Sequence, residues 1–303
     1  MQKINPFLWF NDNAEEAVNF YTSTFNNSKV KTKTRYNEES AKASGMPKDS
    51  VMTIAFDLFR QPFVAINGGP VFKFNPSISF IVNCITGNEV QELWDKLSDG
   101  GTALMQLDKY PFSEKYGWIQ DKYGLSWQII QAAGDFQQVI IPSLLFVGNV
   151  SGKAEEAINH YTSIFSAHDG NESKLISAFR YGSEQKPEKD GTIMFADFKL
   201  NGQIFAAMDS ARKHNFNFNE AVSFVVNCKD QQELDHFWNK LSEGGDPKAQ
   251  MCGWLKDKYG LSWQIVPTIL GELLSSKENG KSQRVMQQVL QMKKLDIETL
   301  MKA

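Results

Sequence analysis

The sequence predicts an α+β protein made of two tandem modules followed by a helical tail. The main observation is an internal duplication, because the nine residues 121–129 recur unchanged as residues 257–265. A Gly-Trp pair also precedes each copy, at Gly117-Trp118 and at Gly253-Trp254. Identity of this length does not arise by chance in a chain of 303 residues, so the two halves are copies of one module.

Shorter matches in the same order indicate where the modules begin and end. Residues 14–17 return as residues 154–157, and residues 79–84 return with a single change as residues 223–228. We therefore expect module 1 to span residues 1–134 and module 2 to span residues 139–268. Residues 269–303 lie beyond the repeat and form the tail.

Each module is predicted to run strand, helix, strands, helix, strand. Residues 7–10 form a short apolar strand, and a helix follows in which Asn13 and Glu16 have the spacing of a capping box. The apolar residues of this helix share one face, as a helix packed on a sheet requires. They are Ala14, Ala17, Val18, Tyr21 and Phe25.

The middle of each module is predicted to hold a hairpin, a further strand and a second helix. In module 1 the hairpin is formed by residues 51–58 and 62–67, and the next strand by residues 78–83. Thr86 begins the second helix, and Asp230 begins its counterpart, each with a Glu three residues later. We expect these helices to bury Val90, Leu93, Trp94 and Leu97 in module 1, and Leu234, Phe237, Trp238 and Leu241 in module 2.

The last strand of each module alternates between apolar and polar residues. In residues 125–130, Leu125, Trp127 and Ile129 should face the helices, so Ser126 and Gln128 should lie on the opposite side of the sheet. The second copy predicts the same alternation for Trp263 and Gln264.

The tail is rich enough in apolar residues to dock on a module or on a partner. Residues 269–275 predict a short helix. Ser282 could cap a second helix that carries Val285, Val289 and Met292, and residues 297–301 predict a third.

Composition excludes several classes of function. The chain is 42% hydrophobic and 22% charged, with a formal charge of -3 and no Lys/Arg cluster, so we expect no nucleic-acid partner. No apolar run approaches the roughly 20 residues of a membrane span, and the N-terminus does not resemble a secretory signal. Three cysteines, Cys84, Cys228 and Cys252, suggest buried reduced thiols in a cytoplasmic protein.

Several of these segments resemble one known family. Residues 6–10, residues 14–17 with Phe20-Tyr21, and the Gly-Trp pair followed by residues 121–129 resemble the PhnB-like branch of the vicinal oxygen chelate superfamily. This is the glyoxalase/bleomycin-resistance/dioxygenase superfamily, and members of the branch are often described as 3-demethylubiquinone-9 3-methyltransferase-like. The resemblance implies βαβββ modules, paired so that two curved mixed sheets enclose a cup.

The resemblance also implies where a metal would bind. In metal-using members, the ligands come from the first strand, from the strand that resembles residues 77–82, and from the end of the last strand. Carried over residue by residue, these places hold Asn5, Ser77 and Gln128 in module 1, and Ile141, Ala221 and Gln264 in module 2. Amides and hydroxyls are weak ligands for divalent transition metals, so we expect no metal site. The histidines, His160, His168, His214 and His236, are expected at helix flanks or in loops.

The cup is instead expected to orient a small molecule with polar and aromatic side chains. Gln128 and Gln264 can orient a carbonyl or hydroxyl group, although each amide could also satisfy a neighbouring backbone group. Asp209 could act as a general base if desolvated, or could cap a turn. The predicted ligand-binding residues are Trp9, Asn67, Ser79, Trp118, Gln128, Asp209, Ser223, Trp254 and Gln264.

Three functions remain open at this point. The first is binding of a small, partly apolar molecule in the cup without the usual metal site. The second is an enzyme of the same superfamily, a lyase, dioxygenase or methyltransferase-like protein with an atypical site, and the third is a closed cup that serves assembly. The sequence favours the first, because it shows no acid–base pair, nucleophile elbow or Gly-rich phosphate loop. We predict no cofactor and no membrane partner, and a homodimer is compatible with such modules.

Overall fold

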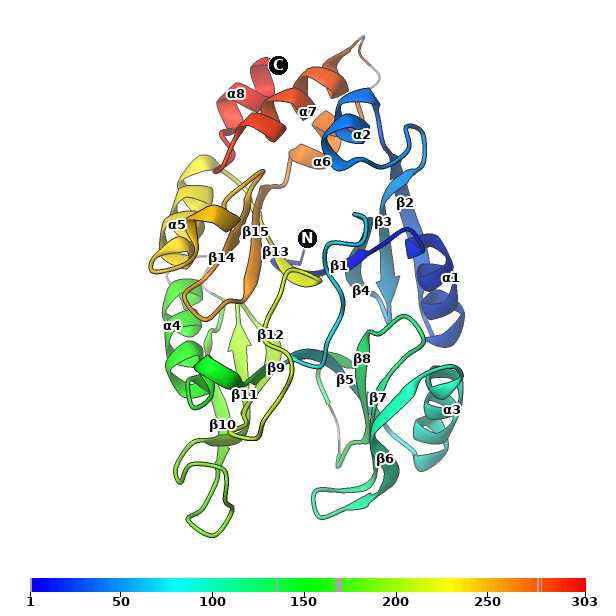
Figure 1. Cartoon of the computed structure of the whole chain (residues 1–303), viewed down its shortest axis with the longest axis vertical. Helices are drawn as coiled ribbons and strands as arrows, with labels where there is room; N and C mark the ends of the chain where they lie inside the picture. Colours follow the sequence, from blue (N-terminus) through cyan, green and yellow to red (C-terminus); the bar gives the residue numbers. More distant parts are fainter. Residues whose placement is uncertain (1, 135, 167–170, 277, 279) are drawn as a thin grey trace. The chain divides into compact units, whose positions relative to one another are not determined.

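The computed structural model describes residues 2–134, 136–166, 171–276, 278 and 280–303 (Figure 1). It has a mixed α+β fold with two sheets of mixed strands, as predicted. The chain divides into two compact units, each of which combines parts of both sequence repeats. Unit 1 holds the described residues of 1–23, 27–73 and 219–303, and unit 2 holds residues 24–26 and the described residues of 74–218.

Unit 1 is built on a seven-stranded sheet in the order β14-β15-β13-β1-β4-β3-β2. At its centre β1 of the first repeat pairs antiparallel with β13 of the second, with Asn5 opposite Val225 and Phe7 opposite Ser223. The strands are β1 (Ile4–Phe10), β2 (Lys29–Arg35), β3 (Val51–Leu58), β4 (Gln61–Asn67), β13 (Val222–Cys228), β14 (Trp254–Lys256) and β15 (Ser262–Pro267).

Helices α1 (Ala14–Thr24) and α5 (Gln231–Ser242) bury their apolar residues against one face of this sheet. We call the face under the helices the outer face and the opposite one the inner face. Asp230 caps α5, because its side chain accepts a hydrogen bond from the backbone N–H of Glu233 as predicted. A further short helix, α2 (Glu38–Ser44), follows β2.

Unit 2 is built on an eight-stranded sheet in the order β10-β11-β12-β9-β5-β8-β7-β6. Here β5 of the first repeat pairs antiparallel with β9 of the second, and helices α3 (Gly87–Ser98) and α4 (Ala154–Ser166) cover the outer face. The strands are β5 (Ile78–Cys84), β6 (Thr102–Tyr110), β7 (Ser113–Gln120), β8 (Ser126–Gln131), β9 (Ile140–Phe146), β10 (Lys174–Arg180), β11 (Ile193–Leu200) and β12 (Gln203–Asp209). The capping box of Thr86 and Glu89 at the start of α3 is present as predicted.

Apart from the short helix α2 after β2, the order strand, helix, strand, strand, strand occurs twice in the first repeat and once in the first half of the second. The last half-repeat is shorter, since eleven residues, 246–256, separate Gly245 from Asp257. In unit 2, nineteen residues, 102–120, separate Gly101 from Asp121 and hold β6 and β7. The tail compensates for the missing strand. The backbone carbonyls of Met292 and Lys293 accept hydrogen bonds from Cys252 and Gly253, over 2.7 and 2.8 Å.

The tail docks on unit 1 through three helices, α6 (Leu270–Leu274), α7 (Lys281–Gln291) and α8 (Ile297–Lys302). Helix α7 packs on α2, and Figure 1 shows α6, α7 and α8 gathered beside α2. The predicted cap of the second tail helix is wrong, because Gly280 occupies the N-cap and the Ser282 hydroxyl donates to the carbonyl of Leu274 instead. No helix among the described residues is long and apolar enough to cross a membrane.

Candidate functional site

The side chains of the repeated nine-residue segment hold the turn that precedes the last strand of each repeat. Asp121 Oδ1 accepts hydrogen bonds from the backbone N–H groups of Tyr123 and Leu125, and Oδ2 accepts one from Trp127 Nε1 at 2.8 Å. Asp257 makes the same three bonds in the second copy, with Trp263 Nε1 at 2.9 Å. Because Trp127 and Trp263 are buried on the outer face, the glutamines that follow them lie on the inner face, as predicted.

On the inner face of unit 2, Gln128 is the centre of a buried hydrogen-bond network. Its Nε2 donates to Ser79 Oγ over 2.8 Å, and its Oε1 accepts from the hydroxyl of Tyr116 over 2.7 Å. Alongside, Trp118 Nε1 donates to Ser126 Oγ over 2.7 Å. The structure therefore brings together three predicted site residues, Ser79, Trp118 and Gln128. Sequence reasoning missed Tyr116, whose pKa is raised by burial.

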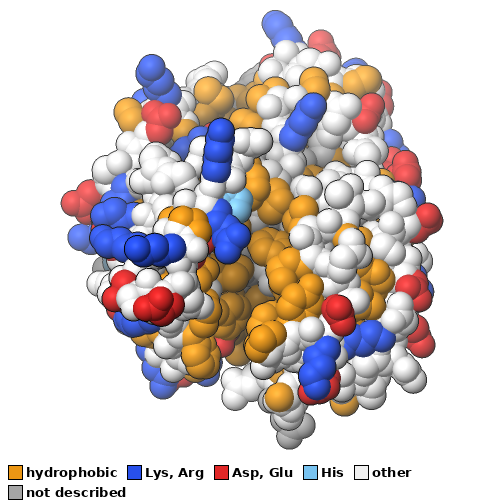
Figure 2. Space-filling model, turned by 60° about the horizontal axis from the view of Figure 1, so that its bottom comes forward, with side chains coloured by type: hydrophobic (Ala, Val, Ile, Leu, Met, Phe, Trp, Pro, Cys, Tyr) orange, Lys and Arg blue, Asp and Glu red, His pale blue; other side chains and the backbone are white. Residues whose placement is uncertain are grey.

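An apolar floor lies beside this network in unit 2. Ile81, Ile141 and Ala206 form a buried cluster, against which Ile130, Phe195 and Ile204 pack. Ser143 lies opposite Ala206 on the neighbouring strand and is fully buried, yet its hydroxyl has no hydrogen-bond partner. Figure 2 shows hydrophobic side chains gathered around a hollow on one face of the molecule. A floor of this kind suits an apolar ligand that carries a polar group.

The edges of the same face carry exposed aromatic rings. Phe112, which is 61% exposed, stands at 78° to the ring of Tyr116 with 5.0 Å between centroids. Phe179 is 59% exposed and lies opposite Phe195 across β10 and β11. Large exposed aromatic side chains beside a partly apolar surface are features of ligand-binding regions.

Aromatic rings pack against one another on the inner face of unit 1. Trp254 lies edge-on to Phe7 and to Trp9, with ring centroids 5.5 and 6.2 Å apart, and Trp9 also packs on Phe72 at 5.1 Å. Trp9 Nε1 donates to the carbonyl of Gly69. Gln264 Nε2 donates to Ser223 Oγ over 3.0 Å, so Gln264, Ser223, Trp9 and Trp254 share one face. These are also predicted site residues.

Asn67 and Asp209 lie on the outer faces and not at the rim of a cup. Asn67 Oδ1 accepts a hydrogen bond from the backbone N–H of Ala14 at the start of α1. Asp209 Oδ1 accepts from the backbone N–H groups of Gly152 and Ala154, where α4 begins. Burial raises the pKa of Asp209, while the backbone N–H groups oppose that shift. Successive residues of a strand point to opposite faces of the sheet, and Asn67 and Asp209 occupy outward-facing positions of β4 and β12. This is why they do not lie at the predicted rim.

The residues at the superfamily's ligand places regroup across the repeats. In unit 1, Asn5 and Gln264 both lie opposite Val225, and in unit 2, Ile141 and Gln128 both lie opposite Ile81. Ala221 and Ser77 precede Val225 and Ile81 by four residues, so neither lies beside the other two residues of its set. In unit 2 the amide oxygen of Gln128 already accepts from Tyr116, and Ile141 has no donor atom. In unit 1 the amide oxygen of Asn5 is buried without a partner. These side chains do not fit a divalent transition metal, which prefers imidazole, carboxylate or thiolate ligands.

The remaining titratable residues do not gather into a metal-binding group. Across the described part of the chain, no three His, Cys, Asp or Glu side chains come close enough to hold a metal ion. His160 lies on α4 and His236 on α5, while His214 Nε2 is 3.0 Å from Ser210 Oγ. His168 lies outside the described residues.

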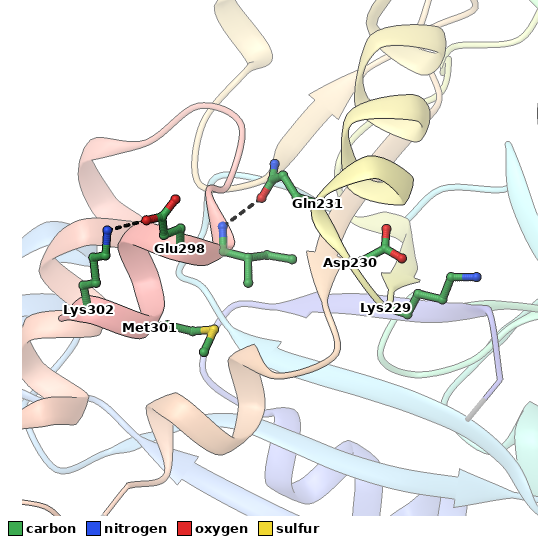
Figure 3. Close-up of a pocket in the computed structure, with 7 residues that line it drawn as sticks. Lys229, Asp230, Gln231, Glu298, Met301 and Lys302 are labelled. Carbon is green, nitrogen blue, oxygen red and sulfur yellow. Dashed lines mark hydrogen bonds and ion pairs between the residues drawn. The ribbon is translucent and has the colours of Figure 1, made fainter.

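A pocket of about 530 Å³ lies in unit 1, between the start of α5 and helix α8 (Figure 3). In it Glu298 pairs with Lys302, and Gln231 Oε1 accepts a hydrogen bond from the backbone N–H of Ile297. No predicted site residue lines this pocket, whose lining is Lys229, Asp230, Gln231, Ile297, Glu298, Met301 and Lys302.

Paired half-repeats that build a mixed sheet with helices on one face define the glyoxalase-like vicinal oxygen chelate superfamily. Glyoxalase I from Zea mays has the same fold, with 12% identity and a TM-score of 0.56 over 92% of this chain and 97% of that chain. Within this superfamily the chain belongs to the family described as 3-demethylubiquinone-9 3-methyltransferase. The family model matches residues 2–130 and 138–266, so each repeat is one copy.

Single-repeat relatives are also similar to this chain. The PhnB protein from Bacillus cereus is 41% identical over 43% of this chain and 100% of its own, with a TM-score of 0.40. A protein from Staphylococcus aureus is 32% identical over 44% of this chain and 98% of its own, with a TM-score of 0.18. The comparison with curated proteins found no match.

Proposed function

We propose that the inner face of unit 2 binds a small, partly apolar molecule without a metal ion. The observation that carries this proposal is the floor around Ala206, where the unpartnered hydroxyl of Ser143 lies beside the cluster of Ile81 and Ile141. An unpartnered buried hydroxyl costs free energy that a ligand with a polar group can recover.

A comparison of the two inner faces favours unit 2 over unit 1. By repeat alignment, Ser143 and Ala206 in unit 2 correspond to Phe7 and Val64 in unit 1. The floor of unit 2 is therefore made of smaller side chains, whereas the rings of Phe7 and Trp254 pack on each other in unit 1. Ile141 also corresponds to Asn5, so the face with the smaller side chains is also the more apolar one at this position.

The residues at the ligand places support binding without metal chemistry. Of Ser77, Gln128 and Ile141, the amide of Gln128 is already hydrogen-bonded to Tyr116 and Ser79, and Ile141 has no donor atom. The family description names a methyltransferase, and glyoxalase I shares the fold, but neither activity is carried by a group that this face presents. Binding is the function that these residues support best.

A neutral aromatic probe tests the proposal on the full chain. We expect 2-methoxynaphthalene to quench tryptophan fluorescence saturably, because Trp118 lies on the proposed surface. Ile141→Asn gives unit 2 the residue that unit 1 carries, and we expect it to weaken probe binding at least tenfold. Asn5→Ile makes the reverse exchange in unit 1 and should leave probe binding unchanged.

Two results would count against the proposal. One is the absence of saturable binding to the unaltered protein. The other is a loss of probe binding in Asn5→Ile with none in Ile141→Asn, which would move the site to unit 1.

A further inference from the structure

Asp197 lies on the inner face of unit 2, next to the apolar floor. It is opposite Ala206 on β12 and opposite Ser177 on β10, and Ala206 is in turn opposite Ser143 on β9. Directly paired residues share a face of the sheet, so Asp197 projects to the same side as the cluster of Ala206. This carboxyl group was not among the site residues that the sequence predicted.

The carboxyl group of Asp197 is poorly compensated within the protein. Its hydrogen bond comes from the hydroxyl of Ser177 at 3.3 Å, and no cation in the described part of the chain pairs with it. Lys199 lies two residues along the same strand and is engaged with Glu172. Burial raises the pKa of Asp197, as expected for a carboxylate that has lost water without gaining a cation.

The fold itself does not require this carboxyl group. The equivalent strand of unit 1, β3, has the same length and the same pairing, and there Ala55 stands opposite Val64. Strand β3 therefore forms with the methyl group of Ala55 at the position where β11 carries the partly buried carboxyl group of Asp197. A residue that costs free energy and is dispensable for the architecture is a candidate for ligand recognition.

We propose that Asp197 is the polar anchor of the unit 2 site, and that the ligand is an apolar ring system bearing a hydroxyl group that donates to it. This inference rests on the proposed function of the same face. Two strand spacings of about 4.8 Å separate Asp197 from Ser143, so their Cα atoms lie roughly 10 Å apart across Ala206. A ligand that displaces the side chains packed on the cluster of Ala206, such as Phe195 and Ile204, would reach Asp197 at one end and the free hydroxyl of Ser143 at the other.

A neutral hydroxyl fits this surface better than an ammonium group. Lys199 is paired with Glu172, and the nearby polar groups of Ser143, Ser79 and Gln128 are neutral. A cationic ligand would have to lose its hydration on this apolar face, whereas a hydroxyl would donate to Asp197 without a net charge to desolvate.

Paired probes that differ in one hydrogen-bond donor test the anchor. The full chain is titrated with 2-naphthol, with its methyl ether 2-methoxynaphthalene, and with the cation 2-naphthylmethylammonium. We expect 2-naphthol to bind about tenfold more tightly than the ether, which corresponds to one hydrogen bond. Asp197→Ala should abolish this preference while leaving the affinity for the ether unchanged. Asp190→Ala removes an exposed carboxylate of the same unit and is the matched control.

The outcomes separate the anchor from the site. If Asp197→Ala keeps the tenfold preference for 2-naphthol, the anchor is refuted while binding of the ether still supports the proposed function. If Asp197→Ala binds neither 2-naphthol nor 2-methoxynaphthalene, the anchor is also refuted, since an anchor acts on the hydroxyl alone. The variant Asp197→Asn, which keeps the shape of the side chain, then checks that the fold is intact. Stronger binding of the ammonium probe contradicts the choice of a hydroxyl. No binding of any probe overturns both proposals.

Discussion

Trp127 Nε1 donates a hydrogen bond to Asp121 Oδ2 over 2.8 Å, at the base of the last strand of the first repeat. The bond ties the indole to the turn that precedes its own strand, and Trp263 and Asp257 repeat it at 2.9 Å. It sets which way the strand faces, because an indole held on the outer face leaves the next residue on the inner face. The most strongly repeated segment therefore serves the architecture, and the ligand surface depends on it indirectly.

The first prediction compares the two sides of this strand. Trp127→Ala and Trp263→Ala should each lower the free energy of unfolding by about 3–5 kcal/mol, because each truncates a fully buried aromatic side chain. Gln264→Ala should cost roughly 1 kcal/mol, since it removes one hydrogen bond to Ser223. Urea denaturation measures all three. Glutamine variants that are less stable than tryptophan variants would show that the facing of the strand is inverted.

Gln128→Ala is a separate case, because the structure gives Gln128 more partners than strand parity alone suggests. It is 3% exposed and bonds both Ser79 and Tyr116, so its loss leaves the buried hydroxyl of Tyr116 without this acceptor. We expect a cost of about 2 kcal/mol, between those of Gln264→Ala and Trp127→Ala. A cost equal to that of Gln264→Ala would mean that water replaces the lost amide.

The second prediction concerns Asn5, whose buried amide oxygen has no hydrogen-bond partner. Asn5→Ile places there the residue that unit 2 carries at Ile141, so the shape suits the strand. Removing an unsatisfied polar group and burying an alkyl group should raise the free energy of unfolding by roughly 1 kcal/mol. Ile141→Asn is the reverse exchange and should be destabilising. If Asn5→Ile melts below the unaltered protein, an ordered partner such as water must satisfy the amide.

Much of the fold follows from the sequence, for reasons visible in particular residues. The helix that buries Val90, Leu93, Trp94 and Leu97 is recognisable because its apolar residues recur with the helical period and Thr86 caps it. Strand β2 was missed, because none of its residues is buried and Lys29, Lys31 and Lys33 are exposed, as at a sheet edge. Strand β6, also at an edge, was missed for the same reason.

The candidate site was harder to predict, because it depends on how the repeats pair. The sequence places Asn5 and Gln128 in one module, but β1 pairs with β13 and β5 with β9, so these two residues belong to different sheets. Asp197 was missed because a single acid in an apolar strand carries no motif. What distinguishes Asp197 is that the equivalent residue of the first repeat is Ala55. This difference is seen only when β3 and β11 are aligned.

The third prediction tests how the tail replaces the missing strand of unit 1. Gly253 has a φ of 85°, and a Cβ there would lie 3.2 Å from Leu295, a fully buried residue of the tail. Gly253→Ala should therefore destabilise the protein by about 2 kcal/mol or more, through backbone strain and displacement of the tail. Gly271→Ala in α6 is the matched control, since nothing lies within 4 Å of its Cβ position. The control should be neutral or stabilising by up to about 1 kcal/mol. Equal melting temperatures of Gly253→Ala and Gly271→Ala would indicate that the tail moves aside without a loss of stability.

The fourth prediction uses the raised pKa of Asp197. Burial disfavours the ionised carboxylate in the folded protein, so folding binds a proton in the interval between the unfolded and the folded pKa. The stability of the unaltered protein should therefore fall as pH rises through this interval, and the full penalty should be present above the folded pKa.

Asp197→Asn removes the ionisation and keeps the shape of the side chain. Its melting temperature should exceed that of the unaltered protein at pH 7, and the difference should shrink as the pH is lowered towards about 4, near the ordinary pKa of an aspartate. Asp190→Asn controls for the change in net charge, because Asp190 is exposed. Thermal melts of the three proteins between pH 4 and pH 8 measure the effect. A difference that stays constant across this range, or grows on acidification, would mean that the Asp197 carboxylate is at least as stable in the folded protein as in water.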